Sequence, residues 1–150
     1  MSFEIVPVST RAELREFIGL PSRVYKGLPG FVAPPNFERA GLLDPRKGSF
    51  FKHGEAQYWL ARKDGASVGR ISAQIDFTQP EGVYDGAGLF GCLDAVDDME
   101  VTSALFATAE AWLRAKGKSR AAGPFLLSLN QEPGLLVAGH LEPPIVSISW

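Results

Sequence analysis

The hydrophobic pattern of residues 87–117 predicts a buried strand followed by a long helix. Ala87–Leu93 is a short apolar run without a polar face, which is typical of a strand covered on both sides. Further along, apolar residues recur every three or four positions with charged residues between them, as in a helix with one buried face. Asp97 and Asp98 predict the N-cap of this helix, and Asp97 and Glu100 have the spacing of a capping box.

Alternation of apolar and polar residues predicts a β-hairpin over residues 56–77. The Asp64-Gly65 dipeptide, which is favoured in tight turns, separates the two strands. One face of the second strand carries Ile71, Ala73, Ile75 and Phe77, and the other carries Arg70, Ser72, Gln74 and Asp76. Val68 breaks the alternation, and a bulge at Gly69 would restore it. The second face, here called the polar row, either lines a cleft or faces solvent.

The N-terminal third predicts one strand and two helices. A strand over residues 3–8 precedes a helix that Gly19 and Pro21 end or interrupt. Segment 22–35 is rich in Gly and Pro but also carries apolar residues that need burial, so it predicts an ordered loop. Asn36–Leu43 predicts a short second helix.

The C-terminal third predicts a strand over residues 119–125, a loop-rich segment over 126–144 with a helical turn at 134–138, and a last strand at 145–150. The last strand, IVSISW, is apolar and leaves an edge that proteins normally cover. We therefore expect it to pair with a second copy of the chain, or with a missing C-terminal half.

Composition narrows the class of protein. The 150 residues suffice for a single domain over 1–150, with 45% hydrophobic and 21% charged residues. Net charge is −2 and basic residues are scattered, so we expect no nucleic-acid or membrane partner. The N-terminus lacks signal-peptide features and no apolar run approaches about 20 residues, which predicts a cytoplasmic protein. The lone Cys92 predicts a small buried side chain, and no metal-ligand spacing is evident.

Four stretches carry a resemblance to a known family, namely residues 53–76, 88–98, 121–125 and 128–139. With the order of elements, they resemble a bacterial group within the GNAT superfamily of acyl-CoA N-acyltransferases, in which an FG-rich strand precedes a DD-capped helix and a GPF strand follows. The resemblance covers nearly the whole chain. It implies an α/β (α+β) fold with a mixed, largely antiparallel central sheet flanked by helices. Members of this group are longer, so the chain resembles an N-terminal half, with a sheet incomplete at its C-terminus.

The resemblance also implies an activity, the transfer of an acetyl or other acyl group from acyl-CoA to an unknown amine, without a metal. In GNAT enzymes the strand before the long helix binds pantetheine, and the next strand, here Arg120–Phe125, splays away from it. Carried over by position, the pantetheine strand comprises Leu89, Phe90, Gly91, Cys92 and Leu93. The loop Asp94–Met99 would meet the CoA pyrophosphate, but it is acidic and lacks glycine, which predicts weakened CoA binding.

Candidate catalytic groups follow the same placement. Asn130 and Glu132 lie where many GNAT sites place polar contacts and form the preferred catalytic pair, although Asn-x-Glu before Pro-Gly is also ordinary turn chemistry. Weaker candidates are the carboxylates Glu55 and Asp76, the imidazole of His53, and the hydroxyls of Tyr58 and Tyr84. The alternative interpretation is a catalytically silent binding or assembly half-domain that keeps the fold without a CoA site.

Overall fold

The computed structural model describes residues 2–82 and 84–143, and within them one mixed sheet forms the centre of the molecule. Its strands are β1 (Phe3–Pro7), β2 (Gly54–Lys63), β3 (Ala66–Asp76), β4 (Ala87–Ala95) and β5 (Arg120–Ala122). Its helices are α1 (Arg11–Val24), α2 (Asn36–Leu43) and α3 (Met99–Ala115), with a 3-10 turn η1 (Ser49–Lys52). The strands lie in sequence order, β1 to β4 antiparallel and β5 parallel to β4. The predicted fold class is confirmed.

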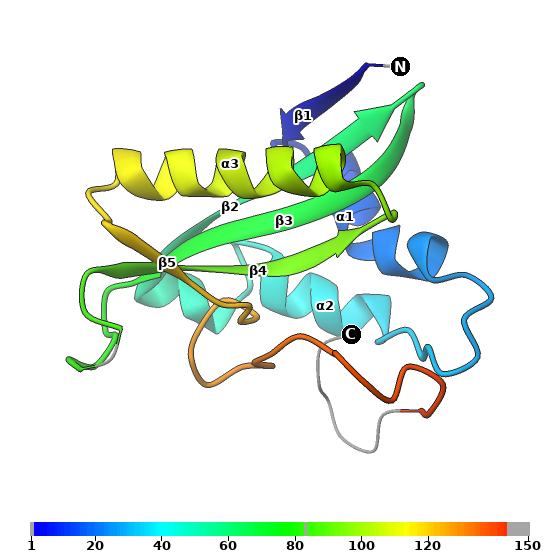
Figure 1. The fold of residues 1–150 in the computed structure, drawn as a ribbon. Coiled ribbons are helices and arrows are strands. Elements are labelled where there is room, and N and C mark those ends of the chain that lie inside the picture. The colour runs from blue at the N-terminus through cyan, green and yellow to red at the C-terminus, as the bar shows by residue number, and fades with distance from the viewer. Residues whose placement is uncertain (1, 83, 144–150) are drawn as a thin grey trace.

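Helix α3 covers one face of the sheet, and α1 and α2 cover the other (Figure 1). Under α3, a buried cluster joins the apolar face of β3 to the helix through Ile71, Ala73, Ile75, Val101, Leu105, Ala109 and Leu113. Phe77 does not belong to this face, because β3 ends at Asp76 and Phe77 is 67% exposed. The predicted apolar face of β3 is therefore confirmed up to Ile75.

The N-cap of α3 is Asp98, whose carboxylate accepts hydrogen bonds from the N–H groups of Glu100 and Val101 at 3.0 and 3.4 Å. The predicted cap is confirmed, but the capping box between Asp97 and Glu100 is wrong. A capping box needs its acidic residue three positions after the N-cap, and Val101 occupies that position.

The second core lies between the sheet and helices α1 and α2. Its buried members come from α1, α2, η1, β2 and the segment after β5, and they are Phe17, Ile18, Leu43, Phe50, Tyr58, Leu60, Leu126 and Leu127. The Tyr58 hydroxyl donates a hydrogen bond of 3.0 Å to the carbonyl of Leu43. This bond satisfies the one polar atom that Tyr58 buries.

Helix α1 does not end at Gly19 or Pro21, as the sequence predicted, but continues to Val24. A proline inside a helix lacks the N–H group that would bond the carbonyl four residues earlier, which here belongs to Phe17. The Arg70 guanidinium donates a hydrogen bond of 2.8 Å to that carbonyl from β3. A tertiary contact therefore supplies the donor that Pro21 removes.

A bulge in β3 restores the alternation that Val68 breaks. Ala61 of β2 pairs with Gly69, and the next residue of β2, Arg62, pairs with Ser67. Val68 is therefore the extra residue, adjacent to the predicted position at Gly69. After β5 the chain has no further helix within the described residues, so the predicted turn at 134–138 is wrong. The predicted strand 145–150 lies outside the described residues.

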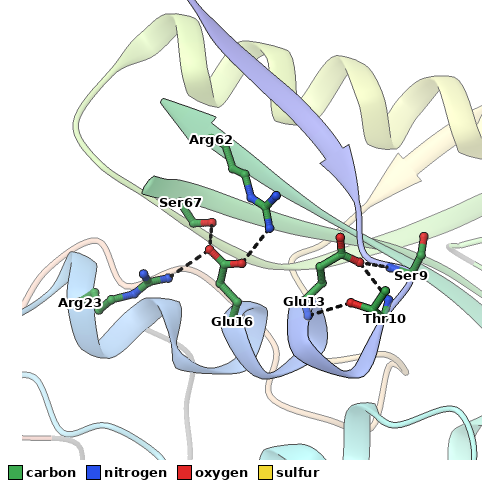
Figure 2. Close-up of polar contacts among 7 residues, drawn as sticks. All are labelled: Ser9, Thr10, Glu13, Glu16, Arg23, Arg62 and Ser67. Atoms are coloured by element: carbon green, nitrogen blue, oxygen red, sulfur yellow. Dashed lines mark hydrogen bonds and ion pairs between the residues drawn. The ribbon is translucent and has the colours of Figure 1, made fainter. Parts of the chain in front are cut away.

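The N-terminal half of α1 is fixed by two glutamates (Figure 2). Glu13 accepts hydrogen bonds from the N–H groups of Ser9 and Thr10, and the Thr10 hydroxyl accepts one from the Glu13 N–H, which makes a capping box. Glu16 faces the hairpin instead. Ser67 donates to its carboxylate at 2.6 Å and Arg62 at 2.8 Å, which ties α1 to both strands of the hairpin.

These carboxylates make stability depend on pH. The N–H of Ser9 lowers the pKa of Glu13, and the Ser67 hydroxyl lowers the pKa of Glu16, below the ordinary value of 4.5. A carboxyl with a lowered pKa in the folded state stabilises the fold above its unfolded pKa, and this contribution is lost as pH falls through the folded pKa. We expect the free energy of unfolding to decrease as pH falls below about 4.5.

Glu16→Gln tests this dependence. At pH 7 the free energy of unfolding of the variant should be about 1 kcal/mol lower than that of the wild type, a modest loss because the ion-paired carboxylate is only partly buried. As pH falls, the free energy of unfolding should decrease less in the variant than in the wild type. Urea unfolding across the acidic range measures both effects, with Glu4→Gln on the exposed edge of β1 as the matched control. A Glu16→Gln variant with the same acid dependence as the wild type would contradict the assignment.

Candidate functional site

Strand β4 is irregular at its centre. Ser72 of β3 pairs with Gly91, and Arg70 pairs with Asp94, so that the single residue Ile71 faces two residues of β4. Cys92 is one of these two, and its φ of 47° lies in the left-handed region that non-glycine residues rarely adopt. Backbone strain of this kind is concentrated at functional sites, and the bulge lies within the predicted pantetheine strand.

Strands β4 and β5 diverge next to this bulge. Their ladder comprises only three residue pairs, from Ala87 with Arg120 to Leu89 with Ala122. The Phe125 N–H donates one more hydrogen bond of 2.8 Å to the Phe90 carbonyl. The chain then turns beneath the sheet, while β4 continues to Ala95 (Figure 1). This divergence corresponds to the predicted splay, and it leaves the β4 edge beyond Gly91 without a strand partner in the described part of the chain.

The polar row of β3 lies in the interior beneath α1, and does not face solvent. Arg70 donates from Nε to Asp94 at 2.7 Å, and the two side chains are only 11% and 8% exposed. Ser72 donates to the Gln74 side-chain oxygen at 2.9 Å, and Gln74 donates to the Phe125 carbonyl at 3.0 Å. The row therefore does not face solvent, and its side chains bond to one another and to neighbouring groups in the interior.

Four ionisable groups lie at the bulge, namely Tyr25, Arg70, Cys92 and Asp94, and the pKa values of the first three are shifted. Burial, reinforced by the neighbouring Asp94 carboxylate, raises the pKa of the Tyr25 hydroxyl well above its usual value. Burial also raises the pKa of the Cys92 thiol, so it stays protonated at neutral pH and is a poor nucleophile. Burial alone would lower the pKa of Arg70, but the charge of Asp94 raises it above its usual value. The bulge therefore has a neutral phenol and an ion pair beside it.

The predicted catalytic residues lie on the turn that follows β5. Glu132 forms an ion pair with Arg39 of α2, at 2.7 and 2.8 Å, with side chains 16% and 13% exposed. Asn130 is exposed on the same turn. The structure thus brings Glu132 to a partner 93 residues away, and does not bring Asn130 to it. The catalytic role of Asn130 and Glu132 stays a prediction.

Two buried polar atoms beside this ion pair have no hydrogen-bond partner among the described residues. They are Arg39 Nη1, a donor, and the side-chain oxygen of Gln131, an acceptor. Buried polar groups are nearly always satisfied, and a water or a ligand hydroxyl supplies both an acceptor and a donor.

The weaker candidates of the sequence lie away from the bulge. His53 Nδ1 is 3.0 Å from Asp76 Oδ1, and Thr78 donates to the same oxygen at 2.7 Å. Asp76 is five residues along β3 from Ile71, which is about 16 Å in an extended strand. Glu55 pairs with Lys116 at 2.8 Å. These contacts hold the ends of strands and helices together, which is a structural role.

The two predicted tyrosines differ from Tyr25 in what they contact. Tyr58 uses its hydroxyl within the core, while the ring of Tyr84 packs edge-on against Phe125 with ring centroids 5.8 Å apart. Tyr25, which the sequence analysis missed, is the tyrosine whose hydroxyl interacts with Asp94 at the bulge. No motif near Tyr25 indicates a functional residue, because the sequence after Pro21 predicts only a loop.

The N-terminus of α3 is already engaged by carboxylate. Asp98 occupies the N–H groups of Glu100 and Val101, and Lys63 lies 3.5 Å from its second oxygen. These N–H groups are among those that a CoA pyrophosphate would use at a helix N-terminus. The described residues of β4 thus suit the pantetheine part of CoA better than the N-terminus of α3 suits its pyrophosphate. The predicted weakening of CoA binding by the acidic loop stays a prediction.

Residues 2–82 and 84–143 contain no group of three His, Cys, Asp or Glu side chains that could hold a metal ion. Across the same ranges, every helix is too short or too polar to cross a membrane.

Two curated proteins resemble the chain closely in sequence, although no family model matches it. A bacterial ceramide synthase of Caulobacter vibrioides is 48% identical over 145 residues, which cover 95% of this chain and 37% of that protein. Protein YghO of Escherichia coli is 44% identical over 132 residues, covering 88% of this chain and 34% of that protein. The chain thus spans about a third of the length of these relatives.

Solved structures share the fold at low identity. A tandem GNAT protein from the clavulanic acid pathway has a TM-score of 0.60 at 19% identity, covering 89% of this chain and 40% of its own. Aminoglycoside 6'-N-acetyltransferase AAC(6')-IG of Acinetobacter haemolyticus has a TM-score of 0.59 at 17% identity, and the match covers 91% of this chain and 96% of that protein. AAC(6')-Iy, solved with a CoA-containing bisubstrate analogue, has a TM-score of 0.56 at 17% identity, and the match covers 81% of this chain and 78% of that protein. At such identities the likeness establishes the fold.

Proposed function

Because the chain has the GNAT fold, we propose that it forms the acyl-CoA-binding part of an N-acyltransferase, which transfers an acyl group from CoA to an amine. The bulge of β4 at Cys92, beside the divergence of β4 and β5, is the observation that carries this proposal. An extended ligand with amide groups, such as pantetheine, pairs with an unpartnered strand edge through backbone hydrogen bonds. Fold neighbours that are acetyltransferases favour this function over a silent half-domain.

Only part of the predicted pantetheine strand has backbone groups that are open to a ligand. Leu89 pairs with β5, and the Phe90 carbonyl accepts from Phe125, so both residues already use backbone groups on that side. The backbone of Phe125 crosses Gly91, and Cys92 and Leu93 follow, where β5 has left the sheet. We therefore place the thioester arm along Cys92 and Leu93.

The proposed acceptor is a long-chain amino alcohol. The relative from Caulobacter vibrioides, 48% identical over 145 residues, is a ceramide synthase. A ceramide is the amide formed between a fatty acid and such an amino alcohol. The proposed reaction forms a C–N bond between the amine and the thioester carbonyl carbon and breaks the C–S bond. The amine nitrogen loses one proton, and the departing CoA thiolate takes up one proton.

Tyr25 is the side chain we assign as proton donor to that thiolate. Its hydroxyl interacts with Asp94, the residue of β4 that follows the bulge, and a phenol at this position can donate a proton to a thiolate that forms beside it. On the acceptor side, Glu132 and Asn130 remain the proposed contacts. The ion pair with Arg39 orients the Glu132 carboxylate.

The transfer is tested by mixing the purified chain with palmitoyl-CoA and sphinganine, a long-chain amino alcohol. Amide is measured by mass spectrometry and free CoA by a thiol reagent, and calorimetry measures palmitoyl-CoA binding separately. We expect amide and CoA in equal amounts. Release of CoA without amide, or failure to bind palmitoyl-CoA, would contradict the proposal for this chain.

Tyr25→Phe should lower the transfer rate about 100-fold while leaving the dissociation constant of palmitoyl-CoA unchanged, because a proton donor acts on the leaving thiolate and not on the bound thioester. Tyr84→Phe is the matched control, because the Tyr84 ring packs against Phe125 and not against the ion pair of Arg70 and Asp94 at the bulge. Equal rates for Tyr25→Phe and wild type would exclude the role, and a weakened acyl-CoA affinity would assign Tyr25 to binding.

The acidic N-terminus of α3 supplies a further prediction. Asp97→Asn with Asp98→Asn removes two negative charges and keeps an N-cap, since asparagine caps as well as aspartate. We expect palmitoyl-CoA to bind about tenfold more tightly, because each charge at a helix N-terminus acts on the phosphates with up to about 1 kcal/mol. Calorimetry checks this, with Glu110→Gln near the other end of α3 as control. An unchanged affinity would mean that the pyrophosphate binds elsewhere.

A further inference from the structure

The side chain of Arg39 in α2 uses only part of its hydrogen-bonding capacity. Its Nη2 lies 2.7 and 2.8 Å from the two carboxylate oxygens of Glu132, and the side chain is 13% exposed. Its Nη1 is buried and has no hydrogen-bond partner among residues 2–82 and 84–143. A guanidinium is planar, so the ion pair at Nη2 also restricts the direction in which Nη1 points. Arg39 therefore holds a charged donor in a restricted orientation.

Arg39 lies on the side of the sheet to which the bulge of β4 contributes Cys92. The neighbour of Arg39 in α2, Ala40, and Cys92 of β4 pack against one buried cluster, which includes Leu43 and Leu127. Burial raises the pKa of the Cys92 thiol, and the positive charge of Arg39 is among those that oppose this effect. A charge acts on a pKa in this way only over a short distance. The Arg39 guanidinium is therefore close to the bulge.

Unusual backbone conformations occur at the same place. Within the described residues, positive φ angles at non-glycine positions occur at Asp64, Cys92, Leu127 and Glu132. Asp64 belongs to the hairpin turn, where such an angle is ordinary. Leu127 and Cys92 share the buried cluster, and Glu132 is the partner of Arg39. Three of the four positions therefore lie around Arg39, and backbone strain is concentrated at functional sites.

The proposed reaction requires a donor near the bulge. When the amine nitrogen adds to the thioester carbonyl carbon, negative charge moves onto the carbonyl oxygen, and it moves to sulfur when the C–S bond breaks. A buried, oriented donor stabilises this oxygen more than water does. Arg70, which also lies at the bulge, already donates to Asp94 and to the Phe17 carbonyl. Nη1 of Arg39 is a charged donor that no such contact occupies.

We propose that Arg39 is a catalytic residue, whose Nη1 donates a hydrogen bond to the acyl carbonyl oxygen of the bound thioester. The inference rests on the proposed function, because it requires an acyl-CoA along Cys92 and Leu93. Through Nη2 the same guanidinium holds Glu132, the residue that we assign to the acceptor. One side chain thus positions the acceptor contact beside the carbonyl carbon that the amine attacks.

Two ligands that differ only at the carbonyl test this hydrogen bond. Palmitoyl-CoA has the carbonyl, and its thioether analogue hexadecyl-CoA has a methylene in its place. We expect calorimetry to show that the wild type binds palmitoyl-CoA about tenfold more tightly than hexadecyl-CoA. Arg39→Lys should bind the two ligands equally, because lysine keeps a charge for Glu132 but lacks the second nitrogen.

Arg62→Lys is the matched control, because Arg62 also pairs with a glutamate at 2.8 Å but joins α1 to the hairpin. This variant should keep the preference of about tenfold for palmitoyl-CoA. With sphinganine as acceptor, Arg39→Lys should lower kcat about 100-fold, as expected for the loss of a donor to the oxyanion. Circular dichroism confirms that each variant is folded.

A second measurement does not depend on a variant. Palmitoyl-CoA labelled with ¹³C at the carbonyl should show a downfield shift of its carbonyl resonance on binding to the wild type, because a charged donor polarises the carbonyl. An unshifted resonance would overturn the inference, even if Arg39→Lys does not fold.

The binding comparison also separates this inference from the proposed function. Equal affinity of the wild type for the two ligands overturns the role of Arg39 and leaves the proposed function standing. Failure of the wild type to bind palmitoyl-CoA contradicts both. The role is also overturned if Arg39→Lys weakens the binding of both ligands by the same factor, because Arg39 then only holds α2 against the turn. A loss of preference in Arg62→Lys has the same consequence.

Discussion

Replacing Arg70 with Met is expected to lower the free energy of unfolding by about 3–5 kcal/mol. The guanidinium binds Asp94 at 2.7 Å and the Phe17 carbonyl at 2.8 Å, and it lies 4.9 Å from the centre of the Phe17 ring. Without it, a carboxylate that is 8% exposed loses its counter-charge, and the carbonyl left open by Pro21 loses its donor. Urea unfolding monitored by circular dichroism measures the loss.

Two further variants identify the cause of this loss. Adding Asp94→Asn to Arg70→Met should recover at least about 1 kcal/mol, because the unpaired buried charge is removed. Arg62→Met removes an arginine that is 27% exposed and pairs with Glu16, and should cost about 1 kcal/mol or less. An Arg70→Met variant no less stable than Arg62→Met would refute the structural role assigned to the buried pair.

Replacing Gly91 with Ala is expected to destabilise the fold by about 3 kcal/mol. A Cβ at this position would fall on the Phe125 backbone oxygen, so the segment after β5 must move away from β4. That oxygen also accepts the hydrogen bond from Gln74, which holds the segment in place. The predicted pantetheine strand therefore contains a glycine because another part of the backbone crosses it there.

Gly19→Ala is the matched control for Gly91→Ala. Gly19 lies inside α1 with no atom within 4 Å of an added Cβ, so alanine should stabilise the helix by about 0.5–1 kcal/mol. Thermal unfolding of both variants compares the two effects. Opposite signs are expected, and a Gly91→Ala variant as stable as the wild type would show that the segment after β5 is not held against β4 in solution.

Local patterns were sufficient for most of the fold. The hairpin around Asp64-Gly65, the bulge next to Gly69 and the helix capped by Asp98 all follow from turn chemistry, alternation and capping, which depend on neighbouring residues. The GNAT resemblance then supplied the mixed, largely antiparallel sheet flanked by helices. The failure at Pro21 is also physical, since the propensity of a proline to end a helix was overridden by a donor from β3, 49 positions away in sequence.

The candidate site was only partly predictable for the same reason. The family resemblance predicted a pantetheine strand over residues 89–93, where β4 proves to be bulged, and it singled out Glu132, but not its partner Arg39 on α2. Tyr25 was missed because nothing near it in sequence indicates that it will meet Asp94.

The sequence by itself determined most of the elements, their order and the apolar faces of β3 and α3, because these depend on residues within a few positions of one another. Only the tertiary structure decided whether the polar row faced solvent and which residues meet at the bulge. Those outcomes depend on contacts between residues far apart in the chain, such as Arg70 with Phe17. Periodicity carries no information about such pairs.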